Sequence, residues 1–286
     1  MAKRRKKRKL RIGRLLVLLI GFLLVIFLFF KGIGALFSLA APKPEVPAET
    51  PEPTPTPDPI NKNDYDMQYL SHNEGIYTYE DENYTSSFGI DVSHYQGTIN
   101  WEKVKEAGVQ FVFIRAGYRG STTGELHEDT CYRENIKGAV NAGLEVGVYF
   151  FSQAVSPEEA EEEAGFLLSL IQEYPVSECV YDLEYSDEGD RASENDQDIN
   201  TAAAASFCKK IWESGYVPLV YGSTNFMYHD IRMEDLQDFT EFWIASYGKD
   251  TPEFPYVYRM WQYACDGEID GIDTVVDFNI RMDKKA

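Results

Sequence analysis

The sequence predicts an α/β fold in which eight β-strands close into a TIM-like barrel, with five strand–helix units followed by three further strands. After residue 88, short apolar segments alternate with amphipathic ones about five times, which is typical of a parallel sheet with helical crossovers. Three more apolar segments follow with little room for helices between them. Closing eight strands into a barrel removes exposed sheet edges. An open, doubly wound sheet is the structural alternative.

The first forty residues have the pattern of a membrane anchor. Nine Lys and Arg residues lie in residues 1–14, and an unbroken apolar stretch follows at 15–30. Sixteen helical residues span roughly 24 Å, and snorkelling of Lys31 extends the span towards the bilayer thickness of about 30 Å. We expect a basic cytoplasmic segment (1–14) and a transmembrane anchor (15–40), with the remaining chain outside the cell membrane. A cleaved signal peptide is the alternative.

A proline-rich linker is expected at residues 41–62, because eight prolines lie within this segment. Proline disfavours helices and sheet ladders and favours extended polyproline II, so the linker would hold the following domain away from the membrane. Residues 63–87 form a polar, tyrosine-rich lead-in segment to which the sequence assigns no role. The folded domain is expected at residues 88–286.

Segments rich in Val, Ile, Phe and Tyr predict the eight strands. They are residues 88–93, 111–118, 145–153, 179–185, 217–223, 242–248, 257–264 and 273–279.

Capping residues mark several of the helices expected between these strands. One helix opens with Ser156 as N-cap, Pro157 at the first helical position and Glu159 placed for a capping box. Another ends before Gly215, a typical C-terminal glycine. The expected helices are residues 101–107, 129–142, 156–174, 201–214 and, less regularly, 226–239.

Charge and cysteine content exclude some functions. Outside the basic segment and Lys31, the chain carries 17 basic against 47 acidic residues. We therefore expect no affinity for nucleic acid, whose phosphates bind Lys and Arg. The four cysteines form no CxxC pair and no His has zinc-ligand spacing, so we expect no metal centre and no cofactor. The pattern favours free thiols and leaves disulfide pairing open.

Acidic residues inside apolar strands are the strongest functional signal: Asp91, Asp182, Glu184 and Asp277. In barrels and open α/β sheets alike, function gathers at the carboxyl ends of the strands. Asp182 and Glu184 are two apart, so they share a strand face with Cα atoms about 6.5 Å apart. Like charges this close raise a pKa, and a carboxyl that keeps its proton near neutral pH can act as a general acid.

Two other kinds of site fit the same spacing. The acids could join a buried salt-bridge network with Arg115 and Arg259, or bind Mg²⁺ or Ca²⁺. Aromatic residues near the strand ends could stack on sugar rings or pack in the core. They are Tyr95, Tyr118, Tyr149, Tyr185, Tyr221, Tyr247, Trp261 and Tyr263.

A series of motifs resembles glycoside hydrolase family 25, the Chalaropsis-type lysozymes. The opening motif is GIDVSHYQGTINWEKVKEAGVQFVFIRAGY at 89–118, and the resemblance extends over about residues 88–281. The further matching motifs are AGLEVGVYFFSQA (142–154), VYDLEY (180–185), GYVPLVYGS (215–223), FWIASYG (242–248), MWQYACDGEIDGID (260–273) and VDFN (276–279).

The resemblance implies a flattened (β/α)5(β)3 barrel that hydrolyses the β-1,4 bond between N-acetylmuramic acid and N-acetylglucosamine in peptidoglycan. By motif, Glu184 corresponds to the general acid and Asp182 to its partner, with Asp91 and Asp277 from the opening and closing motifs. The expected substrate-binding residues are Tyr149, Trp261, Tyr118, Tyr221 and Tyr247.

Phe150 departs from the family pattern, in which many members have His at this position, and this could alter substrate preference. Retaining, inverting and acetamide-assisted routes all remain open, because sequence does not fix the separation of the carboxyl groups. The alternative function is a non-catalytic wall-binding or scaffolding barrel on the outer face of the membrane. A membrane-anchored hydrolase would suit wall remodelling.

Overall fold

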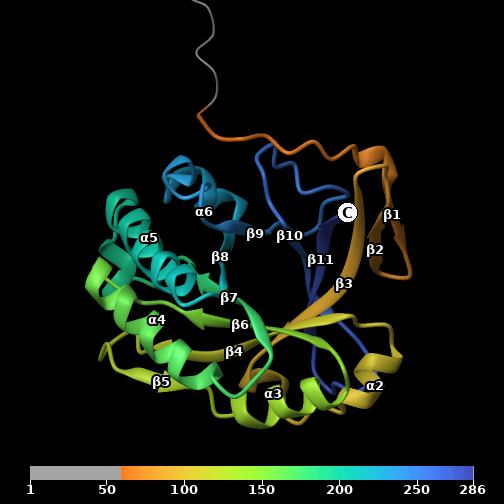
Figure 1. Cartoon of the computed structure of the whole chain (residues 1–286), viewed down its shortest axis with the longest axis horizontal. Helices are drawn as coiled ribbons and strands as arrows, with labels where there is room; N and C mark the ends of the chain where they lie inside the picture. The colour runs from red at the N-terminus through yellow and green to blue at the C-terminus, as the bar shows by residue number, and fades with distance from the viewer. Residues whose placement is uncertain (1–58, 286) are drawn as a thin grey trace, which may run out of the picture. The chain divides into compact units, whose positions relative to one another are not determined.

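The computed structural model describes residues 59–285 (Figure 1). The expected basic segment, the transmembrane anchor and most of the proline-rich linker lie outside the described residues. Within residues 59–285, no helix has the length and apolarity needed to cross a membrane.

Eight strands of the described chain form a closed barrel (Figure 1), in the order β3-β11-β10-β9-β8-β7-β6-β4, and pairing of β3 with β4 closes it. Neighbouring strands are parallel except β11, which runs antiparallel to both β10 and β3. The barrel, and not the open sheet, is therefore confirmed. The strands are β3 (Tyr84–Val92), β4 (Phe111–Arg119), β6 (Glu145–Phe151), β7 (Val176–Asp182), β8 (Val217–Ser223), β9 (Glu241–Ala245), β10 (Met260–Gly267) and β11 (Val276–Lys284).

A helix follows each of β3, β4, β6, β7 and β8, which gives the five expected strand–helix units. At α4, the Ser156 hydroxyl caps the Glu159 N–H as expected, but the Glu159 carboxylate reaches the Val155 N–H instead of completing the capping box. The helices are α2 (Trp101–Glu106), α3 (Tyr132–Asn141), α4 (Pro157–Ile171), α5 (Gln197–Glu213) and α6 (Thr224–His229), with 3-10 turns η1 (Met67–Tyr69), η2 (His94–Gln96), η3 (Arg191–Glu194) and η4 (Met233–Asp235).

Strand alternation divides the core into two parts. On β4, Val112 and Ile114 pack outwards under the helices, whereas Phe111 and Phe113 fill the barrel lumen. The lumen admits these rings because β6 carries Gly147, where a Cβ atom would lie 2.2 Å from the Phe113 ring. The lumen is thus packed below its carboxyl-terminal mouth.

Ion pairs close the opposite, amino-terminal mouth of the barrel. Arg259 pairs with Glu178 at 2.8 Å and with Glu241 at 2.6 Å, and Arg281 pairs with Glu145 at 2.7 Å. Arg259 therefore belongs to a structural network at the end of the barrel away from the candidate carboxylates.

The lead-in segment covers the barrel where crossover helices are missing. It forms a hairpin of β1 (Leu70–Asn73) and β2 (Ile76–Tyr79) beside β3 (Figure 1). Its two-residue turn, Glu74-Gly75, has positive φ at both positions, as a type I′ hairpin requires. From β2, Tyr77 packs on Trp261 with ring centroids 5.0 Å apart. The hairpin and the short edge strand β5 (Leu126–Glu128) are the strands that the sequence did not predict.

Backbone pairing also ties the end of the linker and the start of the lead-in to the connection between β9 and β10. Asn63 N–H donates to the Pro255 carbonyl at 3.0 Å, and Val257 N–H donates to the Asn61 carbonyl at 2.9 Å. The Tyr77 hydroxyl donates to the Lys249 carbonyl at 3.2 Å. The segment without an assigned role is thus part of the folded domain.

Candidate active site

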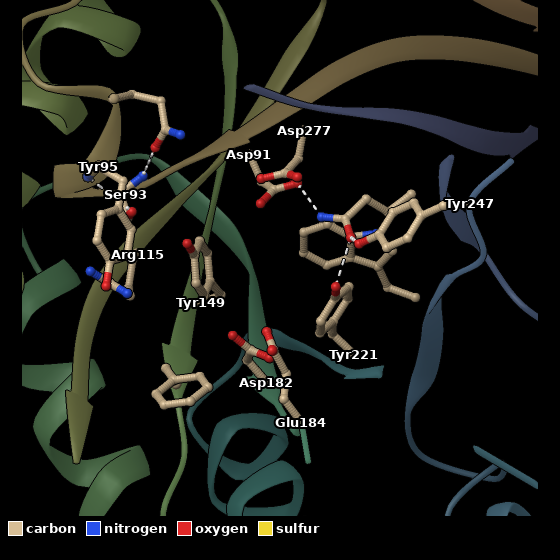
Figure 2. Close-up of a pocket in the computed structure, with 14 residues that line it drawn as sticks. Asp91, Ser93, Tyr95, Arg115, Tyr149, Asp182, Glu184, Tyr221, Tyr247 and Asp277 are labelled. Carbon is tan, nitrogen blue, oxygen red and sulfur yellow. Dashed lines mark hydrogen bonds between the residues drawn. The ribbon is translucent and has the colours of Figure 1, made fainter. Parts of the chain in front are cut away.

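All four candidate carboxylates line one cavity of about 390 Å³ at the carboxyl-terminal mouth of the barrel (Figure 2). Asp91 comes from β3, Asp182 from the last position of β7, Glu184 from just beyond it, and Asp277 from β11. The cavity residues are Asp91, Ser93, Tyr95, Gln96, Arg115, Tyr149, Phe151, Asp182, Glu184, Tyr221, Trp243, Tyr247, Gln262 and Asp277.

The antiparallel direction of β11 brings Asp277 to this mouth. Asp277 is the second residue of β11 and pairs with Asp91, near the end of β3. Figure 2 shows the two carboxyl groups next to each other, opposite Asp182 and Glu184. Residues 186 positions apart in the chain thereby meet in one site.

Asp91 is buried and accepts two hydrogen bonds on the same oxygen. Gln262 Nε2 donates to Oδ2 at 2.7 Å and Asn279 Nδ2 donates to it at 2.8 Å. Burial raises the pKa of Asp91 to about 6, the two amides oppose that rise, and the charge of Glu184 adds to it.

The other three carboxyl groups also hold protons more tightly than usual. Burial raises the pKa of Asp182 well above its ordinary value, and the charges of Glu184 and Asp91 raise it further. Burial followed by the charges of Asp91 and Glu184 raises the pKa of Asp277 to about 8. Loss of surrounding water also raises the pKa of Glu184, while Arg115 and a hydrogen bond with Asp182 oppose the rise. The site therefore holds protons near neutral pH.

Glu184 differs from its neighbours in being exposed to solvent, whereas Asp91 and Asp182 are buried. A carboxyl group at the open rim can reach a bound polymer, and a raised pKa keeps it protonated near neutral pH until it donates the proton. This combination suits Glu184 to donate a proton to a substrate.

Comparison with known proteins identifies the family. Residues 90–272 match the family model described as Glycosyl hydrolases family 25. The chain belongs to this family.

Individual relatives of known name support the same family assignment. The chain is 31% identical over 194 residues to an autolytic lysozyme of Clostridium acetobutylicum, covering 67% of this chain and 54% of that one. The bacterial lysozyme of Streptomyces coelicolor superposes with a TM-score of 0.57 at 25% identity, covering 68% of this chain and 90% of that one. The modular autolysin LytC of Streptococcus pneumoniae in complex with synthetic peptidoglycan ligand gives 0.62 at 25% identity, covering 74% and 51%. The chain thus spans about half the length of the autolytic lysozyme and of LytC.

The arginine in this family 25 site has a partner other than the four acids. Arg115 lines the cavity, but its guanidinium pairs with Asp129 at 2.7 Å. Asp129 also accepts the His94 N–H at 3.2 Å, which gives His94 a structural place. Together with Arg259 at the other mouth, this excludes a salt-bridge network as the reason for the carboxylate cluster. Among residues 59–285, no group of three or more His, Cys, Asp or Glu side chains is arranged to hold a metal ion.

Three of the five aromatic residues expected to bind substrate line the cavity: Tyr149, Tyr221 and Tyr247. Trp261, which was also expected to bind substrate, lies outside the cavity lining. It is 1% exposed beneath Tyr77, and its indole N–H donates to the Ser246 carbonyl at 2.8 Å. Strand alternation explains this position, because the next residue of β10, Gln262, takes the cavity face.

Tyr118 also lies outside the cavity lining. A register irregularity between Arg115 and Gly117 shifts β4 at this point. The Tyr118 ring then stacks on His127 of β5, with centroids 5.1 Å apart. Phe150, the departure from the family pattern, is buried against Phe166 on the outer face of β6 and does not reach the cavity.

The sequence reasoning missed several residues of the site. Trp243 and Gln262 reach the cavity from β9 and β10. The Trp243 indole N–H donates to Asn279 Oδ1 at 2.9 Å, which links it to Asp91. Trp243 and Gln262 lie in the motifs FWIASYG and MWQYACDGEIDGID, where alternation with the correct phase would have found them.

Proposed function

We propose that this chain is a peptidoglycan hydrolase, an N-acetylmuramidase that cleaves the β-1,4 bond between N-acetylmuramic acid and N-acetylglucosamine. The observation that carries the proposal is the convergence of Glu184, Asp182, Asp91 and Asp277 at the open mouth of a family 25 barrel. The names of the relatives support it, since one is an autolytic lysozyme and another binds synthetic peptidoglycan.

Glu184 is the general acid of the proposed reaction. It donates its proton to the glycosidic oxygen as the bond to the sugar carbon breaks, and such donation contributes about 10²–10⁴-fold to the rate. Water then supplies the hydroxyl group that bonds to that carbon and the proton that restores the site. Arg115 favours the ionised form of Glu184 that remains. Asp91 ionises most readily of the other three acids, so its carboxylate stabilises the positive charge that develops on the sugar, while Asp182 and Asp277 stay protonated beside it.

The aromatic walls hold the sugar. Tyr149 and Tyr247 line the cavity beside the carboxyl groups and are partly exposed, whereas Tyr221 and Trp243 are buried behind them. Rings of this kind pack against the apolar faces of pyranose sugars, while the hydroxyl and carboxyl groups accept and donate hydrogen bonds.

We also propose that the domain acts on the outer face of the cell membrane, because a basic segment and an apolar stretch precede the proline-rich linker. Protease added to intact, wall-stripped cells should digest residues 88–286 and spare the first fourteen residues. Protection of the whole chain would contradict this placement.

The activity is tested by incubating the full-length chain, in detergent, with purified peptidoglycan and measuring new reducing ends. Glu184→Gln should lower the rate at least about 100-fold with unchanged thermal unfolding. Glu188→Gln, an exposed acid in the following loop, is the matched control and should retain full activity. Wall binding without new reducing ends would favour the non-catalytic scaffold instead.

A further inference from the structure

Two buried side-chain amides meet on one oxygen of Asp91. Gln262 and Asn279 are 3% and 0% exposed, and both donate to Asp91 Oδ2. Neither amide is free to turn, because each has its oxygen engaged on the other side. Their orientation therefore decides what Asp91 can do.

The orientation of Asn279 follows from its tryptophan partner. An indole N–H donates and never accepts, so Trp243 fixes Asn279 Oδ1 and leaves Nδ2 for Asp91.

The orientation of Gln262 depends on two tyrosines. The hydroxyls of Tyr221, at 2.7 Å, and Tyr247 both donate to Gln262 Oε1. A reversed amide would set its oxygen against the carboxylate oxygen of Asp91, which is repulsive. The amide nitrogen therefore faces Asp91.

An oxygen that accepts two N–H groups is poorly placed to carry a proton itself. Any proton on Asp91 belongs on Oδ1, and charge on Oδ2 is stabilised by both amides. Asp277, directly across in the register, has no such pair of donors among the described hydrogen bonds. The groups that face Asp91 are Asp277 on β11, Asp182 and Glu184 at the end of β7, Tyr149 on β6, Arg115 on β4, Tyr221 on β8 and Tyr247 after β9.

We propose that Gln262 is a positioning residue: held by Tyr221 and Tyr247, it presents its N–H to Asp91 and keeps Asp91 the ionised member of the Asp91–Asp277 pair. The pair then offers one carboxylate and one acid to the same sugar. The catalytic meaning of this arrangement rests on the proposed function, whereas the protonation order does not.

The test is the titration of Asp91 in the full-length chain, in detergent, followed by NMR of ¹³Cγ-labelled aspartate. The Asp91 signal is assigned by its loss in Asp91→Asn. In Gln262→Met, which removes the donor but keeps similar volume, the pKa of Asp91 should rise by about 1 to 2, because a hydrogen bond to a charged group is lost. Gln110→Met is the control: Gln110 lies just before β4 and its side-chain oxygen accepts the N–H of Phe88 in the middle of β3, so the change should leave the pKa of Asp91 unchanged.

Removing the two tyrosine hydroxyls, singly and together, tests whether they hold Gln262 against Asp91; a glutamine with only a packing role would not link them to the Asp91 titration. Tyr221→Phe and Tyr247→Phe should each change the Asp91 titration little, because the other hydroxyl still holds Gln262. The double variant should raise the pKa of Asp91 in the same direction as Gln262→Met but by less, because Gln262 loses both groups that hold its oxygen and keeps its N–H near Asp91. If Gln262→Met does not fold, the titration of Asp91 is measured in the double Phe variant instead.

An unchanged Asp91 titration in Gln262→Met, or in the double Phe variant that replaces it, overturns the proposal. So does an equal shift in Gln110→Met, and so does a shift in Gln262→Met that the double variant lacks. If the wild-type chain hydrolyses peptidoglycan, the pH at which kcat/KM falls on the acid side should be higher in Gln262→Met than in wild type, in step with the raised pKa of Asp91. If it does not, the proposed function fails while the titration still decides the role of Gln262.

Discussion

Replacing Asp277 with Asn should stabilise the protein at pH 8 and have little effect at pH 4. The pKa of this carboxyl rises from the usual 3.8 to about 8 in the folded state. Between these values the folded state binds more protons than the unfolded state, so the free energy of unfolding falls as pH rises through the window. Asn carries no charge at any of these pH values, so the variant does not lose stability in this way as pH rises.

The size of the effect follows from the same difference. About four pKa units correspond to roughly 5–6 kcal/mol, and because Asp277 is only partly buried, solvent screening reduces this to about 2–3 kcal/mol. For a domain of this size that is about 5–10 °C in melting temperature.

Thermal unfolding of wild type and Asp277→Asn, followed by circular dichroism at pH 4, 6 and 8, measures the difference. Asp273→Asn, an exposed acid in the loop before β11, is the control and should show no pH-dependent gain. If Asp277→Asn gained no more stability at pH 8 than at pH 4, the reasoning about a strained acid cluster would be refuted.

Substitutions at three further positions test the packing around the site. Tyr77→Ala should lower the free energy of unfolding by about 3–5 kcal/mol because it uncovers Trp261, whereas Tyr77→Phe, which loses only the hydrogen bond to Lys249, should cost about 1 kcal/mol in urea unfolding. Gly147→Ala should destabilise by about 1–3 kcal/mol in the same assay, since its Cβ meets the Phe113 ring, and a neutral result would contradict the packing of the lumen. Trp261→Phe should leave KM for peptidoglycan within about threefold of wild type, and a tenfold rise, about 1.4 kcal/mol, would return Trp261 to the substrate site.

The sequence was sufficient for the barrel because its signals are local. Each strand is a short apolar segment, and several helices end at glycines such as Gly143 and Gly215, both of which have positive φ. The convergence of Asp91, Asp182 and Glu184 follows equally directly, because parallel strands end at one mouth.

The position of Trp261 could not be predicted from local sequence signals. Which face of β10 meets the cavity depends on its register with β9 and β11, and Tyr77, from a hairpin far earlier in the chain, helps to cover Trp261. Tyr118 was misplaced for a related reason, since a register irregularity in β4 has no sequence signature here. For the hairpin, the turn glycine Gly75, which has a positive φ, is the local sequence signal.

The distribution of protons also lay beyond sequence reasoning. The spacing of Asp182 and Glu184 predicted a raised pKa for one of them, but both are raised, and the larger rise falls on Asp182 because it is buried while Glu184 is exposed. Exposure depends on how the loop after β7 folds, which strand periodicity does not describe.

The identity of the newly formed chain end tests the central claim most directly. Peptidoglycan digested with the full-length chain is reduced with borohydride, and the released fragments are identified by mass spectrometry. Reduced N-acetylmuramic acid at every new end, absent from a digest with Glu184→Gln, is the predicted result. New ends on N-acetylglucosamine, or unchanged fragments with the Gln variant, would contradict a muramidase centred on Glu184.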